Sequence, residues 1–271
     1  MDARVYTKIL KGIGSSSPAY TCPYCGMINY SPVGAFFCSG CEAFVPSPKE
    51  IGQEKIRRAQ EIRDFVKGNS FGEAEKAYES IEEYTTNPYF PYSEALVCIL
   101  ESNYEAGKID YMLKGFMEDN VTHRNNSLAS FSKAKLLFAK AIFTARKNIS
   151  GGENTAEYLH AMFMSYIKSG DLKAAHATLE KVEKLGDALV SEYENMVLKS
   201  NLGDYEGMAK HAEKLLSKDM FAVNAAYYLA YSLFKTKKLK EALILLESFP
   251  DSTENEAVKA LIKEIKRCLE V

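Results

Sequence analysis

The sequence predicts a mostly α-helical protein, a solenoid of antiparallel helix pairs with a small β module near its N-terminal end. Three observations carry this prediction. Two Cys-x-x-Cys pairs lie close together within the first fifty residues. The apolar residues that follow them recur with a helical period. A pattern of two helices joined by a short turn then returns roughly every 34 residues, the signature of a repeat architecture.

The composition is that of a soluble globular protein. The chain has 271 residues, of which 46% are hydrophobic and 26% charged, and its formal net charge is −2. A molecule with this charge is not built as a whole to neutralise a phosphate backbone. No apolar run reaches the ~18 residues that span a bilayer, and the first residues lack the apolar core of a secretory signal. We therefore expect a cytoplasmic protein with no membrane partner.

Residues 1–19 are expected to form a flexible N-terminal extension. They end in a run of Gly, Ser and Pro between Gly12 and Pro18, which is the composition of a linker. Such a terminus is usually poorly ordered unless another part of the protein holds it.

Residues 20–47, which we call the cysteine module, carry the strongest chemical signal. Two Cys-x-x-Cys pairs are separated by twelve residues, and the four thiols belong to Cys22, Cys25, Cys38 and Cys41. Two such turns brought together form a tetrahedral site of four thiolates, which suits one Zn²⁺. Four thiolates fill the zinc shell and leave no open position, so the expected role is structural. A rubredoxin-like iron site uses the same ligands and is the less favoured alternative.

The residues between the two pairs predict a β-hairpin. Short apolar strands at Met27–Tyr30 and Ala35–Phe37 flank a turn that contains Pro32 and Gly34. Gly26 stands where a metal-binding turn needs a residue that tolerates positive φ. With Cys-Pro-Tyr-Cys-Gly as its first turn, the stretch resembles a zinc ribbon. A module this small cannot bury enough core to fold alone, so the metal is expected to supply folding free energy.

The two cysteines outside the module, Cys98 and Cys268, fall in helical patterns. The paired spacing of the other four and the missing signal argue against three disulfides. We expect both to be reduced thiols that behave as small buried hydrophobes.

From residue 50 to residue 271 we expect a helical repeat domain that ends in a capping helix. Three copies of a helix, a Gly/Asp/Lys turn and a second helix lie at 166–182, 198–215 and 233–246, and a weaker copy lies at 65–81. The spacing and pattern of residues 52–86 and 153–250 resemble tetratricopeptide (TPR) repeats. Residues 253–270 have the form of a last helix that covers the final repeat.

Residues 88–150 fit the repeat poorly. Asn87–Tyr92 predicts a rigid turn, followed by helices at 93–102 and 106–118. Residues 128–147 predict one uninterrupted helix, capped at residue 126 or 127 and ended by Gly151 and Gly152.

The resemblance to TPR repeats implies a concave groove lined by the first helix of each pair. The residues that should point into it form an aromatic and apolar stripe suited to an apolar or helical peptide. They are His160, Met164, Ile167, Tyr193, Val197, Asn224, Tyr227, Tyr231 and Phe234. The alternative is that these residues pack in the core, or that the protein's own N-terminal segment or ribbon fills the groove, because such an apolar stripe is seldom left bare.

A second candidate surface is basic. Between Val121 and Gly152 there is no Asp or Glu, whereas six basic residues accumulate there. These anion-binding candidates are Arg124, Lys133, Lys135, Lys140, Arg146 and Lys147. They suit an acidic partner or RNA, and the alternative is a solvated helix face whose Lys stems lie along apolar surface.

We expect no enzymatic activity. The chain has no G-x-G-x-x-G, P-loop, G-x-S-x-G or H-E-x-x-H motif. The expected function is a scaffold or adaptor for protein–protein interaction whose partner the sequence does not identify. The alternative is a nucleic-acid-associated factor that uses the basic 124–147 segment and stacks bases on the module aromatics Tyr24, Tyr30, Phe36, Phe37 and Phe44.

Overall fold

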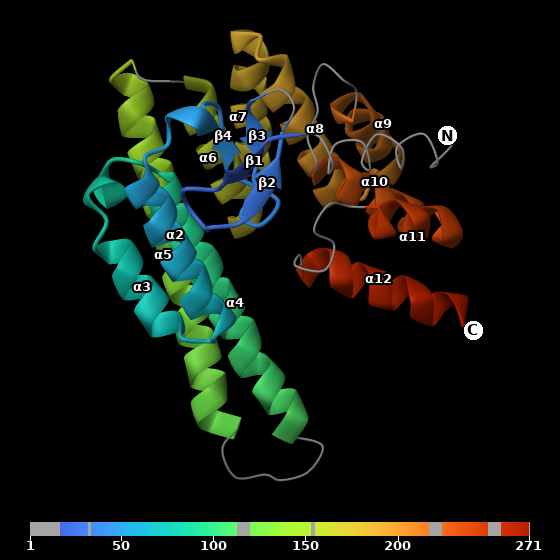
Figure 1. Ribbon diagram of the computed structural model, residues 1–271, viewed down its shortest axis with the longest axis horizontal. Coiled ribbons are helices and arrows are strands. Elements are labelled where there is room, and N and C mark those ends of the chain that lie inside the picture. Colours follow the sequence, from blue (N-terminus) through green and yellow to red (C-terminus); the bar gives the residue numbers. More distant parts are fainter. Residues whose placement is uncertain are drawn as a thin grey trace. The chain divides into compact units, whose positions relative to one another are not determined.

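The structure, a computed structural model, confirms a mostly α-helical solenoid with a small β region near the N-terminal end (Figure 1). It describes residues 17–31, 34–112, 120–152, 155–216, 224–248 and 256–270. Most of the predicted flexible extension, residues 1–16, lies outside this part of the chain. The last residue of that extension, Ala19, begins a β-strand.

The chain divides into two compact units. The first contains Met1–Cys22, Met27–Ile51 and Leu172–Val271, and we call it the module unit. The second contains Pro23–Gly26 and Gly52–Asp171, and we call it the long-helix unit. The predicted division into residues 20–47 and 50–271 was based on the change from the cysteine motif to a helical pattern, and not on compactness. It stays a prediction.

The long-helix unit is built from helices that pack on their neighbours in sequence, α2 on α3, α3 on α4, α4 on α5 and α5 on α6. Its longest members, α4 and α5, run side by side over most of their length (Figure 1). The elements are α2 (Gln53–Lys67), α3 (Phe71–Glu79), the 3₁₀ helix η2 (Glu82–Thr85), α4 (Tyr89–Met112), α5 (Asn120–Ser150) and α6 (Thr155–Ser169).

Two predictions for this unit are wrong in detail. The expected break between helices 93–102 and 106–118 does not exist, because α4 is continuous from Tyr89 to Met112. Polar residues near the expected break face α5: Ser102 Oγ donates to Ser127 O at 2.9 Å, and Glu105 Oε2 lies 2.5 Å from His123 Nδ1. The helix predicted at 128–147 likewise begins earlier, at Asn120, and it ends before Gly151 as expected.

The start of α4 also differs from the predicted rigid turn at 87–92. Asn87 Oδ1 accepts a hydrogen bond from Tyr89 N at 2.9 Å, as an N-cap side chain does. Pro91 then falls in the first turn, where its missing N–H costs no helical hydrogen bond.

The predicted repeat turns share one hydrogen-bond geometry. In each, a residue with positive φ follows the first helix, and the N–H of the next residue donates back to a carbonyl five residues earlier, as in a Schellman motif. These donors, with their distances, are Ser70 to Phe65 O (2.8 Å), Asp171 to Tyr166 O (2.9 Å), Asp204 to Lys199 O (3.0 Å) and Lys238 to Leu233 O (2.8 Å). The residues with positive φ are Asn69, Gly170, Gly203 and Lys237. The repeat recognised in the sequence is therefore a repeated turn in the structure.

The module unit combines the β-strands with the later helices, again packed on their neighbours in sequence. Asp187 and Asp204 cap α8 and α9, each accepting a backbone N–H through its side chain. The predicted last helix is present as α12. The elements are β1 (Ala19–Thr21), β2 (Ile28–Tyr30), β3 (Phe36–Phe37), β4 (Phe44–Val45), the 3₁₀ helix η1 (Pro48–Glu50), α7 (Leu172–Leu185), α8 (Ala188–Asn201), α9 (Tyr205–Leu215), α10 (Asn224–Lys235), α11 (Leu239–Glu247) and α12 (Glu256–Leu269).

Candidate metal centre

The four strands form two short antiparallel ladders, and each ladder encloses one cysteine pair. β1 pairs with β2 around Cys22 and Cys25, and β3 pairs with β4 around Cys38 and Cys41. The hairpin predicted between residues 27–30 and 35–37 is therefore wrong, because each of those strands pairs across its own cysteine turn. Each six-residue connection, 22–27 and 38–43, holds a Cys-x-x-Cys turn whose own backbone hydrogen bond brings the flanking strands together.

The two cysteine turns have matching backbone geometry. Cys22 N donates to Met27 O at 2.8 Å, and Cys38 N donates to Ala43 O at 2.9 Å. The residue after the second cysteine of each pair has positive φ, 70° at Gly26 and 61° at Glu42. The prediction for Gly26 is confirmed, whereas Glu42 takes the same conformation with a side chain that disfavours it.

The four cysteine sulfurs lie close together. All four Sγ atoms are within 4.8 Å of one another, and Cys22 Sγ is 3.7 Å from Cys41 Sγ. A tetrahedral shell with Zn–S bonds of about 2.3 Å places its sulfurs about 3.8 Å apart. The cysteine side chains therefore fit a structural metal site.

Hydrogen-bond donors surround Cys38, one of the four clustered cysteines. Its Sγ accepts from Gly40 N at 3.3 Å and from Asn29 Nδ2 at 3.7 Å. Asn29 Oδ1 accepts from Ser39 N at 2.7 Å, which fixes the amide orientation. Donors of this kind stabilise a thiolate and orient it, as the outer partners of metal ligands do. The donors around Cys38 therefore suit a deprotonated sulfur at this position.

The first cysteine turn is held by residues of the long-helix unit. The Tyr24 ring packs on Tyr89 with centroids 4.8 Å apart, and Tyr78 Oη donates to Tyr24 O at 2.7 Å. Arg63 Nη1 donates to Gly26 O at 3.1 Å. These contacts use backbone carbonyls that a free-standing module would expose to water.

The second cysteine turn is held by α8 and α10 within the module unit. The Phe37 ring stacks on Tyr193 with centroids 3.7 Å apart and planes 8° apart. Asn224 Nδ2 donates to Cys38 O at 2.9 Å and to Tyr193 Oη at 3.1 Å. Two of the predicted groove residues, Tyr193 and Asn224, therefore contact the cysteine module. This is the alternative in which the protein's own ribbon fills part of the groove.

Glu42 adds a charged contact at the same place. Its Oε1 accepts from Tyr228 Oη at 2.5 Å and lies 3.4 Å from Tyr193 Oη. Burial raises the pKa of Tyr193 and Tyr228 well above the ordinary value for tyrosine, and the nearby Glu42 carboxylate raises both further. Both phenols are therefore protonated donors at neutral pH. The sequence showed no reason to select Glu42, whose role depends on a contact far away in the chain.

The remaining groove candidates fall into two groups. His160, Met164, Ile167 and Val197 are buried, so they are core residues and do not line an open groove. Tyr227, Tyr231 and Phe234 are only half-buried. Tyr227 stacks on Tyr231 with centroids 6.3 Å apart, and Tyr231 lies beside Phe234. These three are the accessible part of the predicted stripe.

The module aromatics are not available to stack bases. Tyr24, Phe36, Phe37 and Phe44 are all buried, and Tyr30 is half-buried. The expectation that they form an exposed surface is therefore wrong. Their burial follows from the packing of both cysteine turns on helices.

The basic candidates all lie on α5, and the structure separates one of them from the rest. Lys133 Nζ is 3.0 Å from Glu75 Oε2 and 3.4 Å from Glu94 Oε1, so its charge is compensated inside the fold. The other five are exposed, and within the described residues none pairs with a carboxylate. They are Arg124, Lys135, Lys140, Arg146 and Lys147.

A buried polar cluster around Glu94 is absent from the sequence-based predictions. Glu94 is fully buried, accepts a hydrogen bond from Tyr84 Oη through Oε2, and faces Lys133 through Oε1. Cys98 Sγ donates to Glu75 Oε1 at 3.1 Å. Burial raises the pKa of Glu94, although Tyr84 and Lys133 act in the opposite direction. A single acid in the otherwise apolar start of α4 was the available signal.

The two cysteines outside the module differ from each other. Cys98 is buried, as expected, and burial together with the Glu75 carboxylate raises the pKa of its thiol. Cys268 is exposed near the end of α12, so the expectation of burial is wrong for it. It follows the buried Leu261 and Ile265 by seven and three residues, but it lies in the last turn of α12, where residues 266–270 are all exposed.

In the part of the chain that the structure describes, no helix is long and apolar enough to cross a membrane. No protein-family model, curated protein or solved structure matches this chain. The proposals below therefore rest on the residues and their geometry alone.

Proposed function

We propose that the protein is a non-enzymatic scaffold for protein–protein contacts, a TPR-like solenoid whose cysteine module is a zinc ribbon. In this proposal Cys22, Cys25, Cys38 and Cys41 hold one structural Zn²⁺. Zinc is favoured over iron because a closed shell of four thiolates is its usual structural site. The proposal places the protein in the cytoplasm, where thiols stay reduced and metal-bound cysteines persist.

The observation that carries the proposal is the row of exposed apolar side chains along α5. Val121 is 71% exposed, Leu136 73% and Phe143 70%. The opposite face of the same helix is also apolar and is buried, with Leu137 and Phe138 in the core. A helix that is apolar on both faces is normally covered on both faces. Protein–protein contact explains an exposed row of large apolar side chains of this kind.

The proposal moves the main contact surface away from the predicted groove. Tyr193 and Asn224 already contact Phe37 and Cys38, so a peptide has no room beside them. Tyr227, Tyr231 and Phe234 remain a smaller surface for an apolar or helical peptide.

Site-specific photocrosslinking in the native cell extract tests the proposal. A benzophenone amino acid replaces Leu136 in one variant, Tyr231 in a second and Leu202 in a third. Leu202 is 57% exposed at the end of α8 and serves as the matched control. We expect a discrete crosslinked protein at residue 136 or 231 and none at residue 202. The absence of any discrete product at both test positions would end the proposal.

A second candidate, a nucleic-acid-associated factor, is favoured by the uncompensated charge of α5. Backbone binding depends on Lys and Arg and weakens steeply with salt. Retention on nucleic acid at low salt that is lost in Lys135→Glu with Lys140→Glu would support it. Lys133 is left unchanged in this test because it is paired inside the fold. No retention at low salt excludes this candidate.

A further inference from the structure

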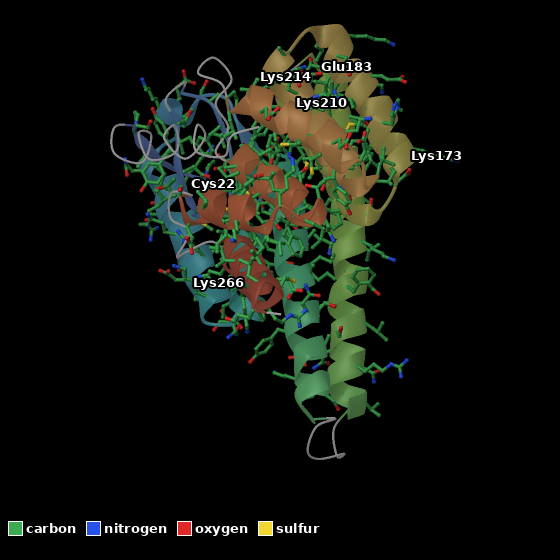
Figure 2. The ribbon with its side chains drawn as sticks, turned by 90° about the vertical axis from the view of Figure 1, so that its right-hand side faces the viewer. Cys22, Lys173, Glu183, Lys210, Lys214 and Lys266 are labelled. Atoms are coloured by element: carbon green, nitrogen blue, oxygen red, sulfur yellow. The ribbon has the colours of Figure 1, made fainter. Side chains whose placement is uncertain are left out.

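The exposed face of α5 combines an apolar stripe with basic edges. Its large apolar residues, Val121, Leu128, Leu136 and Phe143, follow one another at intervals of seven, eight and seven residues. Two helical turns take about 7.2 residues, so these side chains lie along one line of the helix. Leu128 is 55% exposed and the other three are 70% exposed or more. Figure 2 shows side chains projecting from the side of the α5 ribbon that turns away from α4.

The residues between these four continue the same line. Asn125, Ser132 and Ala139 lie at the intermediate positions, so the whole stripe has steps of three and four residues. This is the spacing of the seam along which two helices pack. Small side chains at Ser132 and Ala139 allow a second helix to approach closely. The stripe extends over about 33 Å at 1.5 Å per residue.

Basic residues border the stripe on both sides. At about 100° per residue, Lys140 and Lys147 fall along one edge, and Arg124, Lys135 and Arg146 fall along the other. Lys135 lies over the Phe131 ring at 4.7 Å, and Lys140 lies over the Tyr84 ring at 3.9 Å. Each ammonium group is thus held against an aromatic ring. Charges in these flanking positions select the partner helix in two-helix packing.

We propose that this face of α5 binds an acidic amphipathic helix of a partner protein, one with an apolar seam and Glu or Asp at its flanking positions. This inference rests on the proposed scaffold function and names the chemistry of the partner. The apolar stripe occupies the centre of the face, where a nucleic-acid backbone would need charge. A lipid surface would favour a broad apolar face, whereas this stripe is narrow and interrupted by Asn125 and Ser132.

A second copy of the same helix is a poor occupant. In a two-fold interface α5 would face the same surface on its partner. The five uncompensated basic residues of one copy would then meet those of the other, with no acid between Val121 and Gly152 to pair with them. Like charges at such an interface disfavour association.

Binding of a defined acidic helix to the full-length protein tests the inference. The probe is a fluorescent synthetic peptide of roughly four heptads with Leu at the seam and Glu at the flanking positions. The Glu residues repel one another and keep the peptide from pairing with itself at neutral pH. Fluorescence anisotropy measures its affinity, and vesicles of phosphatidylcholine with phosphatidylserine and a single-stranded polyuridylate serve as competing classes of ligand.

We expect the peptide to bind, and Leu136→Glu with Phe143→Glu to weaken binding by at least about tenfold, because two apolar contacts are lost. Lys135→Glu with Lys140→Glu should weaken it as well, with a larger effect at low salt than at high salt. Leu202→Glu, the control, should leave the affinity unchanged. Circular dichroism should show native helix content in every variant, since all the altered side chains are exposed.

Three results would overturn the inference: no peptide binding at low salt, peptide binding that is indifferent to the α5 variants, or binding of vesicles or polyuridylate in place of the peptide through the same residues. The photocrosslinking described above separates this failure from failure of the scaffold function. A discrete crosslinked protein at residue 231 with no dependence on α5 would leave the scaffold function standing and end the inference about α5.

Discussion

Phe37 of the cysteine module stacks face to face on Tyr193 of α8, with ring centroids 3.7 Å apart and ring planes 8° apart. Both side chains are almost completely buried. The second cysteine turn is therefore part of the core of the module unit and occupies the place where the sequence predicted part of a peptide groove. The metal site and the helices of this unit are then expected to depend on each other for stability.

Removal of the Phe37 ring should destabilise the module unit strongly. Phe37→Ala deletes a buried aromatic and leaves a cavity, which typically costs about 3–5 kcal/mol. Urea unfolding followed by circular dichroism measures the change. Phe143→Ala is the matched control, because Phe143 is 70% exposed and its loss should change stability by no more than about 0.5 kcal/mol. Equal effects of the two substitutions would show that Phe37 is not a core residue.

The hydrogen bond from Tyr228 to Glu42 should contribute to the same packing. Tyr228→Phe keeps the ring and removes the donor, leaving a partly buried carboxylate less well satisfied, at a cost of about 1–3 kcal/mol. Tyr104→Phe, at a tyrosine that is 40% exposed on α4, should change stability by less than about 0.5 kcal/mol. Thermal unfolding of both variants provides the comparison, and an unchanged Tyr228→Phe variant would contradict the prediction.

Gly26 should tolerate no side chain. A Cβ at this position would lie 2.4 Å from Ala59 O, and φ is +70°. We expect Gly26→Ala to cost about 2–5 kcal/mol, the sum of left-handed strain and overpacking. Gly152 has φ of +83° with nothing within 4 Å of a Cβ, so Gly152→Ala should cost only the roughly 1–2 kcal/mol of strain. If urea unfolding showed similar losses of unfolding free energy for Gly26→Ala and Gly152→Ala, Gly26 would not be closely packed on α2.

The buried carboxyl of Glu94 should make stability depend on pH. Its pKa is raised in the folded protein, chiefly by burial. A raised pKa means that the folded state holds the proton more tightly than the unfolded state does. The stabilisation that comes from proton binding at Glu94 is therefore complete below the ordinary Glu pKa of about 4.3 and is lost as pH rises through the raised value. Glu94→Gln should therefore gain stability relative to the unaltered protein between acid and neutral pH. Arg57 and Arg58 lower the pKa of Glu54. The Glu54→Gln variant should therefore lose stability relative to the unaltered protein as pH rises, the opposite of Glu94→Gln. Urea unfolding at a series of pH values checks both signs.

Local patterns predicted much of this structure. The repeat turns were recognisable from the Gly, Asp and Lys residues between paired helices, and the cysteine spacing alone located the four clustered thiols. Gly26 was predictable from its place after Cys25. Each of these features depends on residues close together in the sequence.

The errors concern contacts between residues far apart in the sequence. A break was expected between residues 102 and 106, whereas Ser102 and Glu105 have partners on α5 and the helix continues through them. The module aromatics were predicted to be exposed because Tyr193, which covers Phe37, is more than 150 residues away in the sequence. The contacts of Glu42 and Glu94 were not predicted for the same reason. Burial of a polar or aromatic residue depends on the tertiary packing and cannot be taken from its neighbours in sequence.

The most direct test of the central claim measures amide hydrogen exchange with the metal bound and after its removal by a chelator, together with elemental analysis of the purified protein. We expect one zinc per chain, and on its removal faster exchange both in residues 20–47 and in α8 and α10 around Tyr193 and Asn224. Most of the helix content should remain, and added zinc should restore protection. Faster exchange confined to residues 20–47, or a protein that binds no zinc, would contradict the account of a metal-held module built into the helical core.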